Sequence, residues 1–112
     1  MKLNRRKEKD VWILTFEGPL TAQEVPEFKK VLQPYLKEEP LKFVFDLRHV
    51  SFVDSTGLGA LISFLRKIEP KGGKMVLANL NAEVQSIFEI TRLHKLFRIS
   101  LNLPEALESH GP

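Results

Sequence analysis

The chain has 112 residues, of which 43% are hydrophobic, so its length and composition suit one domain with an ordinary core. It contains no cysteine, which excludes disulfides, thiolate catalysis and a zinc–thiolate site. The net charge of +3 is mild and the basic residues are dispersed, so we expect a solvated surface and no direct nucleic-acid partner.

The first predicted elements are two strands joined by a tight turn. The run "VWILTFEG", Val11 to Gly18, is rich in branched and aromatic residues, which favours a strand. The polar segment "LNRRKEKD" before it suits an edge strand, because edge strands often carry charge that discourages sheet-to-sheet association. We place the turn near Lys9 and Asp10, which makes an antiparallel hairpin at the N-terminus.

A helix is predicted next, within "LTAQEVPEFKKVLQPYLKEEP". Thr21 and Glu24 have the spacing of a capping box, and Pro26 indicates that the helix starts close by. Pro34 should fray the last turn, and Pro40 should close the segment. The apolar residues recur at helical spacing: Val25, Phe28, Val31, Leu32, Tyr35 and Leu36.

The centre of the chain predicts a buried strand followed by a second helix. "KFVFDL", Lys42 to Leu47, is apolar up to Asp46, which is typical of a strand buried on both faces and therefore central in a sheet. The second helix is expected at about Thr56 to Ile68. Its apolar stripe is Leu58, Leu61, Ile62, Leu65 and Ile68.

The remaining segment alternates again between strand and helix. "MVLAN" predicts a short buried strand, and "LFRIS" a short final one. Asn81 should cap a third helix, and Pro104 fits the first turn of a short C-terminal helix. In the third helix the residues expected to face inward are Val84, Ile87, Phe88 and Ile90.

This alternation predicts an α/β fold in which residues 1–112 form a single domain. We expect a mixed, mostly parallel sheet of four to five strands, with the antiparallel hairpin at one edge and about four helices packed on it. In such folds function sits where strand C-termini meet helix N-termini. The stretch "FVDSTGLG", Phe52 to Gly59, lies at such a place.

Several kinds of site are excluded at this stretch. A Walker loop needs G-x-x-x-x-G-K-[ST], a dinucleotide fingerprint needs a third glycine, and a nucleophile elbow needs glycine where Val53 stands. The aspartates and histidines show no metal-ligand spacing. We therefore expect no enzyme, no metal and no cofactor.

Two interpretations of the stretch remain open from the residues alone. Asp54 or Ser55 suits the N-cap of the second helix. "STGLG" also places hydroxyls and glycines at a helix N-terminus, where phosphates bind, although a flavin-type phosphate loop usually follows the first strand.

The segment "FVFDLRHVSFVDSTGLGALISFLRKI" resembles the anti-sigma factor antagonists of the STAS-domain family. The similarity lies in an apolar strand ending in D-L, an apolar pair, and then D-S-[ST]-G-L-G. "GPLTAQEVPEF" is similar to the start of the family's first helix, and "MVLANLNAEVQSIFEITRLHKLFRI" to its third helix and closing strand. The resemblance thus covers almost the whole chain.

The resemblance implies a bacterial partner-switching regulator of transcription. Ser55 would be phosphorylated by a partner that is both an anti-sigma factor and a serine kinase. The unphosphorylated protein would bind that partner and release sigma factor, the phosphorylated protein would let go, and a phosphatase would reset the switch. The expected partner-binding residues are Thr21, Asp54, Ser55, Thr56, Gly57, Leu58 and Gly59.

Each of these residue types suits the expected role. Gly57 and Gly59 carry no bulk, so a kinase active site can approach the backbone closely. Leu58, in an exposed first turn, would be an apolar anchor for the partner, and Thr56 a packing or capping group. Phosphorylation should block the interface electrostatically and leave the backbone nearly unchanged.

The chain also departs from the family's pattern. Relatives often have an acidic residue where Thr21 stands, a glycine at Arg92 and an acid at His94; we interpret His94 as a surface residue. The alternatives are a constitutive STAS scaffold with an unused serine, and a small phosphate- or flavin-binding α/β module. No apolar run approaches the roughly 18 residues that span a bilayer, so we expect no membrane partner. Because "MKLNRRKEKD" leads into no signal-like region and no coiled-coil repeat is visible, we expect a cytoplasmic monomer.

Overall fold

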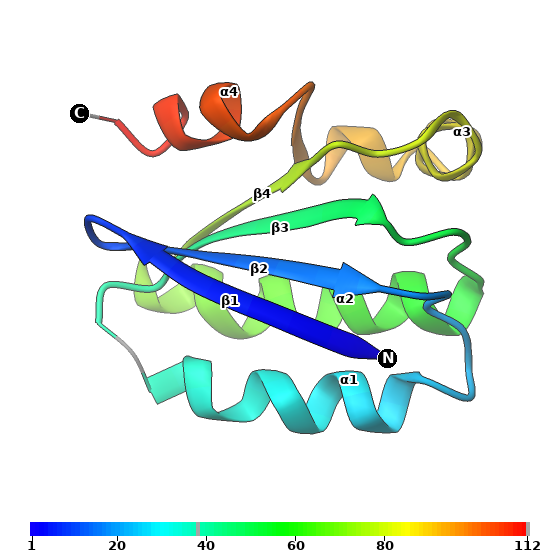
Figure 1. Cartoon of the computed structure of the whole chain (residues 1–112), viewed down its shortest axis with the longest axis horizontal. Coiled ribbons are helices and arrows are strands. Elements are labelled where there is room, and N and C mark those ends of the chain that lie inside the picture. The colour runs from blue at the N-terminus through cyan, green and yellow to red at the C-terminus, as the bar shows by residue number, and fades with distance from the viewer. Residues whose placement is uncertain (38, 112) are drawn as a thin grey trace.

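A five-stranded sheet forms the centre of the computed structural model, which describes residues 1–37 and 39–111 (Figure 1). The strand order is β1-β2-β3-β4-β5; β1 runs antiparallel to β2 and every other neighbouring pair is parallel. The predicted edge hairpin, the mostly parallel α/β sheet and the central place of β3 are thus confirmed. The strands are β1 (Lys2–Glu8), β2 (Val11–Glu17), β3 (Lys42–His49), β4 (Lys74–Ala78) and β5 (Arg98–Ser100).

Helices cover both faces of this sheet (Figure 1). The α-helices are α1 (Val25–Leu32), α2 (Ser55–Ile68), α3 (Ala82–Ile90) and α4 (Leu103–Glu108). Short 3₁₀ segments η1 (Gln33–Lys37), η2 (Glu69–Lys71) and η3 (Leu93–Lys95) follow the first three. None of the helices in the described ranges is long and apolar enough to cross a membrane.

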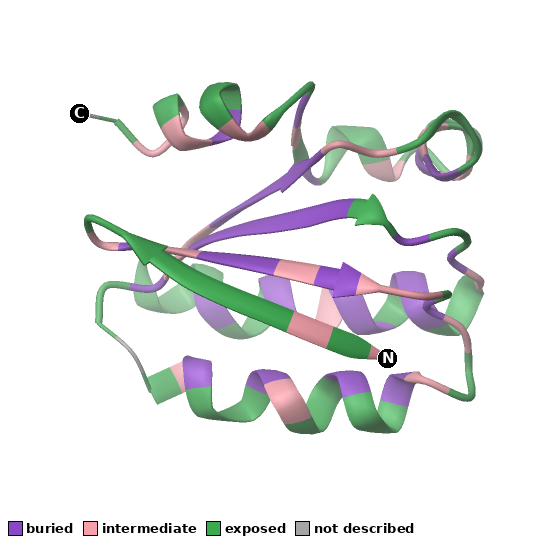
Figure 2. Ribbon diagram, viewed as in Figure 1, coloured by how far each residue is buried: buried purple, intermediate pink, exposed green. Residues whose placement is uncertain are grey.

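The two faces of the sheet have separate apolar cores. The larger core lies under α1 and α2, extends to Val84 and Phe88 of α3, and is built around packed rings such as Phe16 and Phe45. The smaller core joins branched side chains of β2, β3 and β4 to Ala106 of α4. Figure 2 shows the resulting pattern, with buried strands at the centre and helices that are buried on one side only.

The capping box predicted for α1 is wrong, although Pro26 does lie in its first turn. The backbone N–H of Glu24 donates to the Thr21 carbonyl at 2.9 Å, so it is not free for the Thr21 side chain. The Thr21 hydroxyl instead donates to the Glu24 carboxylate at 2.6 Å. Residues 21–24 therefore form a turn, and α1 begins at Val25 without a side-chain cap.

The prediction for α3 is partly correct. Asn81 caps the helix, accepting the Val84 N–H at 2.8 Å, and Val84 and Phe88 are buried. Ile90 is 81% exposed, so its predicted inward position is wrong. At 3.6 residues per turn, Ile90 lies about 120° around the helix from Val84, outside the buried stripe.

Candidate functional site

Two loops meet at the carboxyl edge of the sheet and hold the stretch that the sequence singled out. We call the junction the loop after β2 (residues 18–24), the loop after β3 (residues 50–54) and the first turn of α2 (residues 55–59). Leu20 and Val53 form an isolated parallel bridge between the loops. The Leu20 N–H donates to the Phe52 carbonyl at 2.8 Å, and the Asp54 N–H donates to the Leu20 carbonyl at 3.3 Å. The two loops therefore continue the parallel pairing of β2 and β3 beyond the strands.

The Asp54 carboxylate fastens these loops to α2. Its Oδ1 accepts the Gly57 N–H at 2.8 Å, which makes Asp54 the N-cap of α2. Its Oδ2 accepts the Ala22 N–H from the other loop at 2.9 Å. These two hydrogen bonds lower the pKa of the Asp54 carboxyl below its ordinary value, and the bond from Gly57 has the larger effect. Asp54 is therefore ionised at neutral pH, and it leaves Ser55 free of the capping role.

Ser55 and Thr56 are exposed as the first two residues of α2. Asp54 occupies the cap position, so the packing or capping role expected for Thr56 is wrong. Gly59, one turn further along the helix, is also exposed. The junction thus presents two adjacent hydroxyls on a surface that a second protein can reach.

The two glycines of the junction have different roles, and the role expected for Gly57 is wrong. Gly57 is buried, and a Cβ at this position would lie 2.2 Å from the Leu20 carbonyl oxygen and 3.0 Å from Cγ1 of Val53. Its missing side chain lets the loop after β2 contact the helix, so it provides no opening for a partner. A Cβ at Gly59 would meet no atom within 4 Å, which leaves that position open to close approach.

Leu58 does not serve as an exposed anchor, which corrects the expectation from the sequence. Its side chain is only 7% exposed and belongs to the larger core, as does that of Leu61. Because residues three and four apart share a helix face, Leu58 follows the buried stripe of α2. The exposed apolar side chain at the junction is instead Phe52, at 43%. The sequence analysis did not single out Phe52. The available signal was that neighbouring residues of an extended segment point to opposite sides, so an inward Val53 places Phe52 outward.

A carboxylate lies at the start of the first helix, although Thr21 stands where the family resemblance leads us to expect an acid. Thr21 is half-buried, and its hydroxyl holds the Glu24 carboxylate at 2.6 Å. The negative charge at this helix start therefore comes from Glu24, three residues after Thr21. Neither Glu24 nor the backbone N–H of Ala22 was among the predicted site residues.

The other polar residues weighed from the sequence lie on the surface. His49 ends β3 and is exposed. His94 is exposed, as expected, with its Nδ1 3.2 Å from the Phe88 carbonyl oxygen. Arg92 has φ 63°, the left-handed conformation that glycine adopts most readily, which explains why glycine suits this position.

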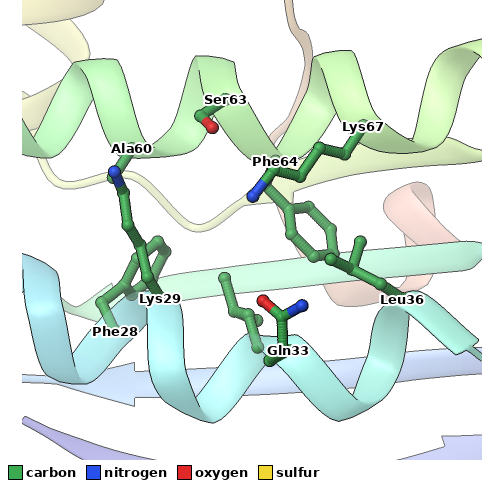
Figure 3. Close-up of a pocket in the computed structure, with 9 residues that line it drawn as sticks. Phe28, Lys29, Gln33, Leu36, Ala60, Ser63, Phe64 and Lys67 are labelled. Carbon is green, nitrogen blue, oxygen red and sulfur yellow. The ribbon is translucent and has the colours of Figure 1, made fainter.

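The junction offers little room for a phosphate-bearing cofactor. The Gly57 and Leu58 N–H groups, which would hold a phosphate at this helix end, already donate to Asp54 at 2.8 and 2.9 Å. A groove between α1 and α2 holds only about 20 Å³. Figure 3 shows Lys29 extending across this groove from α1 towards Ala60 of α2, with Phe64 at its floor. The geometry fits a protein-binding surface better than a nucleotide cradle.

Fold and junction together define a small α/β module with an exposed serine at a capped helix start. The STAS domain model matches residues 2–106, and the chain belongs to this family. The protein is similar to relatives that are called anti-sigma-B factor antagonists. One, from Listeria monocytogenes, is 32% identical over 82 residues, 73% of this chain and 72% of the relative. Another, from Staphylococcus aureus, is 29% identical over 83 residues, 74% of this chain and 77% of the relative.

The fold similarity extends over nearly the full chain. A crystal structure of a candidate anti-sigma factor antagonist from Thermotoga maritima superposes with a TM-score of 0.89 at 28% identity. The match covers 96% of this chain and 92% of the Thermotoga chain. It therefore includes the sheet, the junction and the helices on both faces.

Proposed function

We propose that this protein is an anti-sigma factor antagonist that binds an anti-sigma factor through the junction and thereby releases sigma factor. The names of the relatives support this proposal, and so does the surface itself. Ser55, Thr56 and Gly59 are exposed, Phe52 adds an exposed apolar side chain, and Thr21 lies beside them across the Asp54–Ala22 bond. Asp54, Gly57 and Leu58 contribute indirectly, because they fix the shape of that surface.

We further propose that the partner is also a serine kinase, that it phosphorylates Ser55, and that a phosphatase reverses the modification. The observation that carries this step is the exposed position of Ser55 next to a cap made entirely by Asp54. Because the fold does not use the Ser55 hydroxyl as a cap, modifying it leaves α2 intact. This protein is then the substrate of the switch and performs no catalysis itself.

The electrostatics of the junction give phosphorylation its effect. A phosphoserine adds about −1.5 to −2 charges at neutral pH. At Ser55 this charge would follow directly on the ionised Asp54, with Glu24 on the neighbouring loop. The helix N-terminus tolerates negative charge, so the penalty falls on the complex. A desolvated or like-charge contact at an interface costs several kcal/mol, which corresponds to roughly a hundredfold in affinity.

The experiment is to incubate the protein with its partner kinase and ATP and to map phosphate by mass spectrometry. We expect a gain of about 80 Da on the peptide containing Ser55, absent from the Ser55→Ala variant. Thr56→Ala is the matched control, because Thr56 is the adjacent exposed hydroxyl and its variant should still be modified at Ser55. If a kinase that binds the protein leaves Ser55 unmodified, the switch is wrong and a constitutive scaffold replaces it.

A further inference from the structure

A second hollow lies away from the junction, between α3, β5 and α4. Its volume is about 480 Å³, within the range of about 300–1,000 Å³ typical of ligand-binding clefts. Its lining includes Leu80, Glu89, Ile99, Leu101 and Glu105. No residue of the junction contributes to the lining, so it is a separate surface from the one that holds Ser55.

The hollow has an apolar floor with one side chain exposed to solvent. Leu80 and Ile99 are half-buried against the larger core. Leu101, directly after β5, is 81% exposed although it is a large hydrophobic residue. An apolar side chain of a partner placed here would remove Leu101 from water, which is favourable in proportion to the area buried.

The charge of the hollow is opposite to that of the chain. Its lining includes the carboxylates of Glu89 and Glu105, the imidazole of His94, and neither lysine nor arginine, whereas the whole chain has a net charge of +3. Within residues 1–37 and 39–111 the ion pairs are Arg6–Glu8 and Lys42–Asp10, so neither lining carboxylate is neutralised by one. Glu89 accepts only a side-chain amide from Gln85 at 3.2 Å. A cationic partner group would therefore find two carboxylates available.

We propose that this hollow docks a basic segment of a partner protein, with one large apolar side chain over Leu101 and flanking lysines or arginines beside Glu89 and Glu105. The combination of an exposed leucine with two unneutralised carboxylates selects this chemistry over an acidic or purely apolar segment. Because the lining excludes the junction, this contact is independent of Ser55 phosphorylation. The protein would then have one binding surface that phosphorylation controls and a second whose affinity does not depend on phosphorylation.

The test measures the fluorescence anisotropy of a labelled peptide in which one leucine is flanked by lysines, at low ionic strength. The matched probe has glutamate in place of each lysine. We expect saturable binding of the basic peptide that weakens as salt is added, and none of the acidic one. Equal binding of both peptides, or no binding of the basic peptide at millimolar concentration, would overturn the proposal.

Two pairs of variants locate the binding. Leu101→Ser should raise the Kd for the basic peptide roughly tenfold, about 1.4 kcal/mol, whereas Ile90→Ser should have little effect on this Kd. Ile90 is the matched control because it is equally exposed, at 81%, but does not line the hollow. Glu89→Gln with Glu105→Gln should also weaken binding, and Glu83→Gln, on α3 outside the lining, should not.

Two further measurements distinguish this hollow from the junction and from a contact between copies of the chain. Ser55→Glu should leave the affinity for the basic peptide unchanged, so a failure here is distinct from a failure of the switch at Ser55. Sedimentation of wild type and Leu101→Ser should give the same mass. If Leu101→Ser instead abolished self-association, the hollow would be a contact between copies of this chain and the proposal would be wrong.

Discussion

Replacing Gly57 with alanine tests whether the contact between α2 and the loop after β2 shapes the junction. The new Cβ would lie 2.2 Å from the Leu20 carbonyl oxygen, and reaching 3.0 Å requires a displacement of 0.8 Å. The atom that must move is backbone, and Leu20 also bonds Phe52 and Asp54 across the loops. The strain cannot be relieved by turning a side chain, so the loops must separate.

The expected loss of stability follows from two opposing effects. Overpacking of this kind costs about 1–3 kcal/mol. Alanine in place of glycine within a helix returns about 0.5–1 kcal/mol. We therefore expect the Gly57→Ala variant to lose about 1–2 kcal/mol of unfolding free energy, or roughly 5–10 °C in Tm.

Gly59→Ala is the control, because a Cβ there meets nothing within 4 Å and only the helical gain should remain. Urea denaturation of both variants measures the two free energies of unfolding on the same helix. We expect Gly59→Ala to be more stable than wild type by about 0.5–1 kcal/mol. If Gly57→Ala were as stable as Gly59→Ala, the close contact would not exist and its role in shaping the junction would be refuted.

Substitutions at three other positions test single features, each by urea denaturation. Asp54→Ala should lower the urea midpoint more than Asp54→Asn. Folding lowers the pKa of the Asp54 carboxyl, so the stabilisation that this carboxylate provides is present above pH about 4 and is lost as pH falls through the folded pKa. The same midpoint for wild type and Asp54→Ala would contradict the bridging role. Burial lowers the pKa of His110, whose Nε2 lies 2.9 Å from the Phe43 carbonyl oxygen. Stability should therefore fall as pH drops below about 6.5, and His110→Gln should show a flatter profile; identical profiles would count against this. Arg92→Gly should gain about 0.5 kcal/mol, since relieving the left-handed strain outweighs the added chain entropy; a loss of stability would contradict that balance.

The sheet and most helices were predictable because their signals are local. The branched and aromatic run of β2, the apolar run of β3 and the helical stripe of α2 each lie within about a dozen residues. Asn81 and Asp54 were predictable as caps for the same reason, since a short polar side chain precedes each apolar pattern. The hairpin followed from its polar edge strand and turn.

The details of the junction were less predictable because they depend on a loop distant in sequence. Leu20 and Ala22 contact the start of α2 through backbone atoms, which leave no signature in residue type. The burial of Gly57 follows from that contact, whereas residue type alone indicates only a glycine near a helix start. Leu58 had two possible places, in the apolar stripe or in an exposed first turn, and packing against the core decided between them.

The end of α3 shows a different limit. Val84 and Phe88 were correctly predicted as buried because they are four residues apart on one face. Ile90 is the last residue of the helix and lies outside the buried stripe. An apolar residue type there indicated burial that the geometry does not provide.

Phosphate on Ser55 should weaken binding to the anti-sigma partner without refolding the protein. The most direct test is titration calorimetry of the purified partner with the unphosphorylated and the Ser55-phosphorylated protein at the same salt concentration. We predict a Kd at least about a hundredfold higher for the phosphorylated form, with backbone NMR shifts changed only around the junction. Dissociation constants that agree within a few fold would contradict the switch and leave Ser55 as a residue of a constitutive binding surface.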